Sequence, residues 1–213
     1  MSPPAPTRED YYRVLADCLP DDALTVTCLG NASYLWARVR DRPENFYIED
    51  AMGLALPLAL GLAVAQPGRK VVGVEGDGGL LMHMGALITV GAVAPGNLTV
   101  LLMNNRVHAA SGGQPLTNQN LDLAELARSA GWARTENVGD PEGFRSAFLS
   151  AIEGDGPSFL ALAVKPDVQV VEPPRPLNPV VTKERFMEAI GAPRYVSSTF
   201  GRGRMVEPPS PSK

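Results

Sequence analysis

Short apolar runs alternate along the chain with longer segments in which apolar residues recur at helical spacing. The apolar runs, several of them rich in β-branched residues, are bounded by Gly, Pro, Asn or Asp and lie at residues 23–30, 45–50, 70–76, 97–104 and 158–165. Such runs are typical of strands that are buried on both faces, as in parallel sheets. Helical spacing marks residues 33–40, 52–66, 80–93, 121–132 and 141–154. We therefore predict an α/β fold with a mostly parallel sheet flanked by helices.

The two ends of the chain differ from this core in composition. Residues 1–7 and 201–213 are rich in Pro, Ser and Gly and have little to bury, so we expect flexible termini. Residues 8–170 carry the alternating pattern and form one predicted domain. Residues 171–200 are predicted to be a proline-rich connector followed by a helix at Thr182–Ile190, which packs on this core or on a neighbouring molecule.

Charge and composition narrow the range of partners. The 213-residue chain is 45% hydrophobic and has a net charge of −4, so it offers no basic surface for nucleic acid or for an anionic membrane. Its start lacks the features of a signal peptide, and no apolar run approaches the length of a membrane span, so we expect a cytoplasmic protein. Cys18 and Cys28 lack metal-ligand spacing and are predicted to be packed thiols.

The candidate chemistry lies at the ends of two neighbouring apolar runs. One run ends in Gly76-Asp77-Gly78-Gly79, and the next ends in Asn104-Asn105. Ligands of open α/β sheets bind beyond the carboxyl ends of strands. The glycines allow a tight turn whose N–H groups can meet phosphate oxygens, while Asp77 and an Asn carbonyl are oxygen ligands that Mg²⁺ prefers. A Gly-Asp-Gly turn alone is most often only a turn, but together the two motifs indicate a Mg²⁺-diphosphate site.

The spacing of these motifs carries a resemblance to a known family. Gly76-Asp77-Gly78, followed after 25 residues by Asn104-Asn105, resembles the thiamine diphosphate signature of 2-oxo acid decarboxylases and acetohydroxyacid synthases. Residues 41–115 are most similar to phosphonopyruvate and sulfopyruvate decarboxylases. The resemblance implies a diphosphate-binding (C-terminal or β) subunit fold that binds thiamine diphosphate and Mg²⁺.

The resemblance also implies roles for individual residues. The metal ligands would be the side chains of Asp77 and Asn105 and the backbone carbonyl of Val107, and the Gly78 and Gly79 amides would meet the diphosphate. Met52, which stands 25 residues before Asp77, matches a bulky apolar residue that holds the two cofactor rings in a V. Its alternative interpretation is an ordinary core residue at the start of a helix.

Further roles concern the reacting end of the cofactor and the substrate. By the resemblance, the backbone carbonyl of Asp50 would accept a hydrogen bond from the 4′-amino group of the cofactor. His108 is a candidate proton or hydrogen-bond donor to the substrate, or else a cap of the loop after the strand. Arg106 could neutralise an anion or form an interface salt bridge, and His83 is assigned to packing or to a subunit contact.

The substrate-facing part of the loop departs from the family pattern. Arg106 replaces a glycine, Ala109 replaces a glutamate, Ala110 replaces a serine and Ser111 replaces a valine. The lost polar groups could hold a phosphonate or sulfonate, so we expect a different or less polar 2-oxo acid substrate.

The resemblance implies a carboxy-lyase in which the cofactor supplies most of the chemistry. In this family a glutamate from a pyrimidine-binding domain activates the cofactor, and we expect this chain to be too short to carry that domain. A separate partner subunit would supply the glutamate, in an α2β2 or larger heteromer. Two alternatives stay open: a carboligase resembling acetohydroxyacid synthases, and a non-catalytic accessory subunit.

Overall fold

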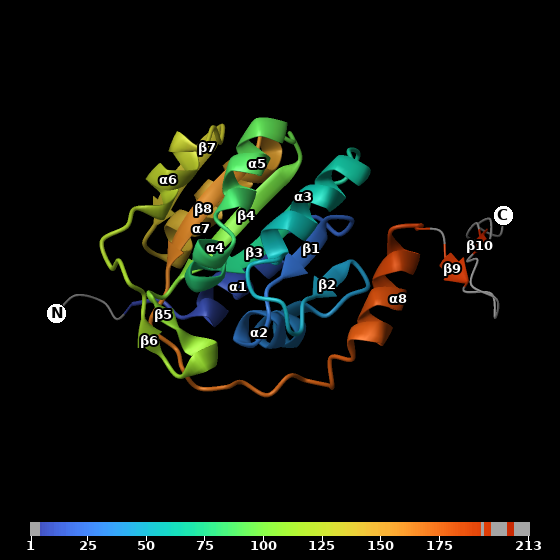
Figure 1. Cartoon of the computed structure of the whole chain (residues 1–213), viewed down its shortest axis with the longest axis horizontal. Coiled ribbons are helices and arrows are strands. Elements are labelled where there is room, and N and C mark those ends of the chain that lie inside the picture. Colours follow the sequence, from blue (N-terminus) through green and yellow to red (C-terminus); the bar gives the residue numbers. More distant parts are fainter. Residues whose placement is uncertain (1–4, 193, 197–203, 207–213) are drawn as a thin grey trace.

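The computed structural model describes residues 5–192, 194–196 and 204–206, and at its centre is a six-stranded sheet (Figure 1). The strand order is β2-β1-β3-β4-β8-β7, and every neighbouring pair is parallel. The predicted α/β fold with a mostly parallel sheet is confirmed. The strands are β1 (Leu24–Thr27), β2 (Asn45–Tyr47), β3 (Val71–Gly76), β4 (Leu98–Asn104), β7 (Arg134–Val138) and β8 (Ser158–Ala163).

Helices cover both faces of the sheet and give three layers (Figure 1). One face carries α1 (Arg8–Cys18), α2 (Asn31–Arg40) and α7 (Pro141–Glu153). The other face carries α3 (Ala55–Ala65), α4 (Asp77–Met82), α5 (Gly85–Val93), α6 (Leu123–Ser129) and α8 (Pro179–Ala189). None of the helices in the described residues combines the length and apolar character that a membrane crossing requires.

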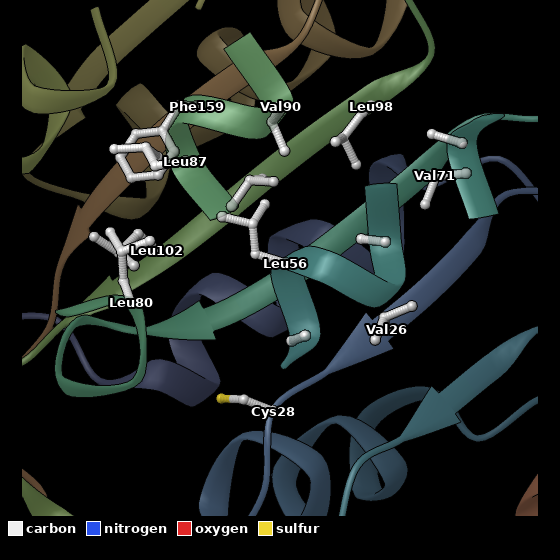
Figure 2. Close-up of a cluster of buried hydrophobic side chains, with 14 of the residues drawn as sticks. Val26, Cys28, Leu56, Val71, Leu80, Leu87, Val90, Leu98, Leu102 and Phe159 are labelled. Atoms are coloured by element: carbon white, nitrogen blue, oxygen red, sulfur yellow. The ribbon is translucent and has the colours of Figure 1, made fainter. Parts of the chain in front are cut away.

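Successive side chains of the central strands enter different cores. Val71 packs in the cluster beneath α3, α5 and α6, together with Leu98 and Phe159, as Figure 2 shows. Val72 and Val74 of the same strand pack in the cluster beneath α1, α2 and α7. Because both faces are covered, both alternating sets of residues must be apolar, which explains why these strands appear in the sequence as unbroken apolar runs.

One helix and one strand of the layered core, α1 and β7, were not predicted from the sequence, and neither were the short strands β5 (Val107–His108), β6 (Gln114–Pro115), β9 (Arg194–Val196) and β10 (Arg204–Val206). Helix α1 begins with a capping box in which Thr7 and Asp10 exchange hydrogen bonds, and it buries Tyr11, Tyr12 and Leu15 at helical spacing. Strand β7 has the polar sequence RTENV and pairs with only one neighbour at the edge of the sheet, so it lacks the apolar run used to recognise the other strands.

The predicted helix at residues 80–93 is wrong in its bounds. The segment forms α4, which already begins at Asp77, and α5, which begins at Gly85. The backbone of His83 leaves the helical conformation between them, with φ −127° and ψ 41°. After β4, Val107–His108 (β5) and Gln114–Pro115 (β6) form a small antiparallel hairpin around a 3-10 turn at Ala109–Ser111.

The C-terminal helix packs back on the core. It begins at Pro179, three residues before the predicted start. The ring of Phe186 lies edge-on against that of Phe46 in β2, with the ring centroids 5.4 Å apart. Arg175 of the connector forms two hydrogen bonds with Asp41, of 3.0 and 3.2 Å.

The termini of the chain lie partly outside the described residues, and neither cysteine forms a disulfide. Of the termini predicted to be flexible, residues 1–4, 201–203 and 207–213 lie outside the described residues. Arg204–Val206 (β10) pairs antiparallel with Arg194–Val196 (β9). Both cysteines are free, and Cys28 is buried in the core (Figure 2).

The end of α5 gives a stability prediction. Exposed Ala94 has a left-handed backbone, with φ 49° and ψ 53°, a conformation that glycine adopts at much lower cost. We expect Ala94→Gly to raise the free energy of unfolding by about 0.5–1 kcal/mol in urea titrations. The matched control Ala92→Gly, at an exposed position in the last turn of the same helix, should lower it by up to about 1 kcal/mol. Equal destabilisation by both changes would contradict this account.

Candidate functional site

A cavity of about 240 Å³ opens at the carboxyl ends of β1, β3 and β4. The chain runs from β1 to β2 on one side and from β3 to β4 on the other, so the point between β1 and β3 is where the strand order reverses. Ligands of open α/β sheets bind at such a switch point. The lining includes Arg8, the loop 28–32, Tyr34, Met52, Gly53, residues 75–79, Asn105 and residues 107–110.

Asp77 occupies the centre of this edge. It directly follows β3, and its side chain is 2% exposed. One carboxylate oxygen accepts a hydrogen bond of 2.7 Å from the N–H of Gly78, and the other accepts one of 2.5 Å from the N–H of Arg106. Burial raises the pKa of Asp77 above its ordinary value, although the two N–H donors and the positive charge of Arg8 oppose the rise. A cation at this carboxylate would remove the cost of its burial.

The other predicted metal ligands lie at the same edge. Asn105 directly follows β4 and is buried, and its side-chain oxygen accepts a hydrogen bond of 3.2 Å from the N–H of Val107. Asp77, Asn105 and Val107 all line the cavity. A carboxylate, an amide oxygen and a backbone carbonyl form the kind of oxygen donor set that Mg²⁺ prefers. The residues present therefore fit a magnesium ion.

The glycines of the turn are required by close neighbours. A Cβ on Gly78 would come within 2.6 Å of Nδ1 of His108, and a Cβ on Gly79 would come within 2.5 Å of Oε1 of Glu75. The N–H of Gly78 is directed at Asp77, and that of Gly76 donates to Glu75 over 3.0 Å. Only residues without a side chain allow this turn to pass so close to the cavity wall.

Glu75 was missed by the sequence reasoning, although a charged residue inside an apolar run was the available signal. It is buried, and burial raises the pKa of its carboxyl group. One oxygen accepts from the N–H of Gly76, and the other accepts a hydrogen bond of 3.1 Å from the N–H of Ala55. Glu75 thereby ties the end of β3 to the first residue of α3, and with it positions the preceding loop.

That loop brings Met52 into the cavity but not Asp50. Met52 is 37% exposed and lines the cavity beside Gly53. Gly53 has a φ of 74°, and a Cβ there would lie 2.5 Å from the carbonyl oxygen of Gly79. Asp50 is exposed and is absent from the cavity lining formed by the described residues. His83, also exposed, packs against Gly53, so it supports the loop from outside.

His108 and Arg106, both after β4, line different cavities. The ring of His108 lies over Gly78 and faces the cavity. Arg106 has a left-handed backbone, with φ 61°, which explains why a glycine in the family pattern suits this position. Its exposed side chain lines a second cavity, of about 460 Å³, together with Asn104 and Asp122. Arg106 is therefore outside the lining of the cavity at Asp77.

Two further parts of the lining were also missed. Gly30, Asn31 and Ala32 place the N-terminus of α2 at the cavity, where the helix dipole favours an anion. Arg8 of α1 reaches the same cavity and is buried. Its signal in the sequence was a basic residue in the first turn of a helix, where the dipole disfavours one.

The side chain of Asn31 ties the connector to the rim of the cavity. It donates to the carbonyl of Gln169 over 2.7 Å and accepts from the N–H of Val171 over 2.9 Å. Val168 and Val170 of the same segment line the cavity. The segment after β8 therefore contributes an apolar wall that the sequence did not reveal.

Several relatives of this chain are named as decarboxylases. Phosphonopyruvate decarboxylase of Streptomyces viridochromogenes is 40% identical over 154 residues, which cover 72% of this chain and 38% of that protein. Sulfopyruvate decarboxylase subunit beta of Methanothermobacter thermautotrophicus is 36% identical over 173 residues, which cover 80% of this chain and 88% of that protein. The chain thus spans less than half of the length of the phosphonopyruvate decarboxylases that it matches, at 38% and 49%.

Solved structures show the same fold. Benzoylformate decarboxylase from Polynucleobacter necessarius superposes with a TM-score of 0.69 at 18% identity, over 77% of this chain and 34% of that one. The thiamine diphosphate-dependent 4-hydroxybenzoylformate decarboxylase of Rhodococcus jostii RHA1 gives 0.66 at 22% identity, over 79% of this chain and 34% of that one. Residues 26–162 match the family described as thiamine pyrophosphate enzyme, C-terminal TPP binding domain. The chain belongs to this family.

Proposed function

We propose that this chain is the diphosphate-binding subunit of a two-subunit, thiamine diphosphate- and Mg²⁺-dependent 2-oxo acid decarboxylase. The observation that carries the proposal is the meeting of Asp77 and Asn105, from the ends of two adjacent strands, at one cavity beside the Gly78-Gly79 turn. Relatives that are 30–40% identical are named phosphonopyruvate decarboxylase or sulfopyruvate decarboxylase, which supports this reaction class.

The residues of this chain have separate tasks in the proposed site. Asp77, Asn105 and the carbonyl of Val107 hold Mg²⁺, and the N-terminus of α2 and the Gly78-Gly79 turn face the diphosphate. When bound, the cofactor supplies the electron sink that allows the 2-oxo acid to lose carbon dioxide. Met52 would support the rings of the cofactor, and His108 would donate a hydrogen bond or proton to the substrate. The carbonyl of Asp50, which lies outside the cavity lining formed by the described residues, would accept a hydrogen bond from the amino group of the cofactor.

A partner subunit is supported by the surface of the helical layer around α3 and α5. Both helices are apolar on all sides, so one side of each packs on the sheet and the other remains uncovered. Exposed large apolar side chains of this layer are Met52, Leu54, Val64, Met82, Met84, Ile88 and Val93. Patches of this kind mark protein interfaces. The chain also matches 88–97% of three proteins named sulfopyruvate decarboxylase subunit beta, which supports a two-subunit enzyme.

The wall of the cavity favours a 2-oxo acid with a less polar side group. Ala109 and Ala110 stand on the hairpin side of the cavity, and Val168 and Val170 stand on the connector side. A second anionic group buried among these residues would lack donors, which would cost several kcal/mol. We therefore expect a substrate whose side group is not a phosphonate or sulfonate.

A carboligase is the second candidate for the same site. Acetolactate synthase isozyme 2 large subunit of Escherichia coli is 30% identical over 166 residues, which cover 70% of this chain and 30% of that protein. In a carboligase, the carbon that has lost carbon dioxide would add to the carbonyl group of a second molecule, whereas in a decarboxylase the same carbon would take up a proton. Analysis of products with and without an acceptor aldehyde distinguishes the two: a simple aldehyde product supports the decarboxylase, and a 2-hydroxyketone supports the carboligase.

Metal-dependent cofactor binding tests the site. Asp77→Asn keeps the size of the side chain but removes the charge that binds Mg²⁺, so it should abolish the Mg²⁺-dependent part of thiamine diphosphate binding in the assembled enzyme. Calorimetric titration with and without Mg²⁺ measures this. Asp155→Asn, at an exposed position outside the cavity, is the matched control and should bind as the wild type does. If Asp77→Asn binds thiamine diphosphate with Mg²⁺ as tightly as the wild type does, the assignment of Asp77 as a metal ligand is wrong.

Assembly should depend on the apolar layer around α5. Ile88 is 64% exposed on that helix, so Ile88→Asp should leave the single chain folded but prevent complex formation with the pyrimidine-binding subunit. Size-exclusion chromatography with light scattering reads out the complex, and circular dichroism confirms folding. Leu149→Asp, on α7 in the opposite helical layer, should still assemble. Decarboxylation by the purified single chain would contradict the shared site.

The role of His108 separates turnover from cofactor binding. In the reconstituted complex, His108→Ala should lower kcat by about 100-fold or more, because a positioned proton donor contributes on this scale. The affinity for thiamine diphosphate should change little, since the ring lies over Gly78 without holding the metal. Steady-state kinetics on a panel of 2-oxo acids and calorimetry measure the two quantities. Asp155→Asn, outside the cavity, is again the control, and an unimpaired His108→Ala enzyme would show that the ring only packs.

A further inference from the structure

A buried arginine in the cavity has no partner among the described residues. Arg8 is 7% exposed, and its Nε is buried without a hydrogen-bond acceptor. None of the ion pairs within the described part of the chain includes it. Arg8 nevertheless lines the cavity that contains Asp77. Buried polar groups are almost always satisfied, so a buried Nε without an acceptor, on an arginine that lines a cavity, indicates a ligand.

The cost of this arrangement makes a purely structural role unfavourable. Removing a cation from water without pairing it costs several kcal/mol. Position 8 also opens α1, and a basic side chain in the first turn gains nothing from the helix dipole. The packing of α1 is supplied by Tyr11, Tyr12 and Leu15, which are fully buried. The fold therefore gives no reason to place a charge here, whereas an anionic ligand does.

The surroundings of Arg8 identify which anion it would meet. Its charge opposes the burial-driven rise in the pKa of Asp77 and also that of Cys28, so the guanidinium lies near the ends of both β3 and β1. The N-terminus of α2, which favours anions, opens onto the same region at Gly30. Among the described residues that line the cavity, Arg8 is the only Lys or Arg. A fully ionised diphosphate carries more negative charge than one Mg²⁺ neutralises, so a further cation beside the metal would stabilise it.

We propose that the guanidinium of Arg8 binds the terminal phosphate of thiamine diphosphate, on the side of the cavity bounded by Asp77 and the N-terminus of α2. The inference rests on the proposed function of the cavity and adds a binding residue to it. The planar guanidinium can donate two parallel hydrogen bonds to one phosphate, a geometry that lysine lacks. Arg8 thus links α1 to the cofactor and pairs its own charge only when the ligand is bound.

Calorimetry on the full chain tests the inference without enzyme activity. The ligands are Mg²⁺-pyrophosphate, thiamine diphosphate with Mg²⁺, and thiamine monophosphate with Mg²⁺. Arg8→Met replaces the cation with an unbranched apolar side chain and should weaken binding of the two diphosphates by about 10- to 100-fold. Arg8→Lys should lie between it and the wild type. Thiamine monophosphate lacks the terminal phosphate, so its binding should not change.

Thermal unfolding without ligand provides the second readout. Arg8→Met should change the stability little, because removal of a buried charge without an ion-pair partner offsets the loss of its attraction to Asp77. The control Arg13→Met alters an exposed position of the same helix and should change neither binding nor stability beyond the loss of a surface ion pair with Glu9. A clear loss of stability in Arg8→Met would show that the residue has a structural role and would overturn the inference.

The remaining outcomes separate this inference from the proposed function. If the wild type binds Mg²⁺-pyrophosphate and Asp77→Asn does not, the diphosphate site stands. Wild-type affinity in Arg8→Met would then overturn the role of Arg8 alone. A raised KM for the 2-oxo acid in the reconstituted complex, with unchanged diphosphate affinity, would assign Arg8 to the substrate and also overturn the inference. Absence of diphosphate binding by the wild type would overturn both.

Discussion

The hydrogen bond from the N–H of Arg106 to the carboxylate of Asp77 joins the carboxyl ends of the two central strands. It fixes the point at which the chain turns after β4, and so it fixes Asn105 relative to Asp77. Glu75, two residues earlier, bonds to the first turn of α3 and holds the loop that carries Met52. Two buried carboxylates therefore position the two walls of the cavity. Both line the cavity and have raised pKa values because of burial, but Glu75 is bonded to the N–H groups of Gly76 and Ala55, whereas Asp77 is the one predicted to bind the metal.

The fold could be predicted from the sequence wherever burial on both faces makes a strand apolar throughout. Four strands, β1, β3, β4 and β8, have this property, and their parallel pairing follows from the helices between them. The edge strand β2 was recognised as well, because Phe46 and Tyr47 stand in its short sequence. Strand β7 could not be recognised in this way, because an edge strand with one neighbour has little to bury and its sequence is polar. The break at His83 is likewise absent from the apolar pattern, and His83 lies beside Gly53, in a loop far away in the sequence.

The same distinction applies to the site. Asp77 and Asn105 could be predicted because each lies at the end of a strand, and strand ends on neighbouring parallel strands converge. The place of Arg8 could not be predicted, because Arg8 reaches the cavity from α1, and the position of this helix against the sheet is set by tertiary packing. Two roles stayed open for Arg106, neutralisation of an anion or an interface salt bridge, because it directly follows the predicted metal ligand Asn105 in the sequence. Its left-handed backbone turns the side chain toward another cavity, and adjacency in sequence gave no information on that direction.

Met52 connects the cavity to the apolar helical layer. It lines the cavity and is also one of the exposed apolar residues of that layer. A subunit that covers α3 and α5 would also approach Met52, because the loop that carries this residue leads directly into α3. Burial of the layer and closure of the cavity over the cofactor rings are then one event, driven by the removal of apolar surface from water. In the proposed function, the chain would supply the diphosphate end of the site as a preformed pocket, and the ring end would take its final shape only when the partner is bound.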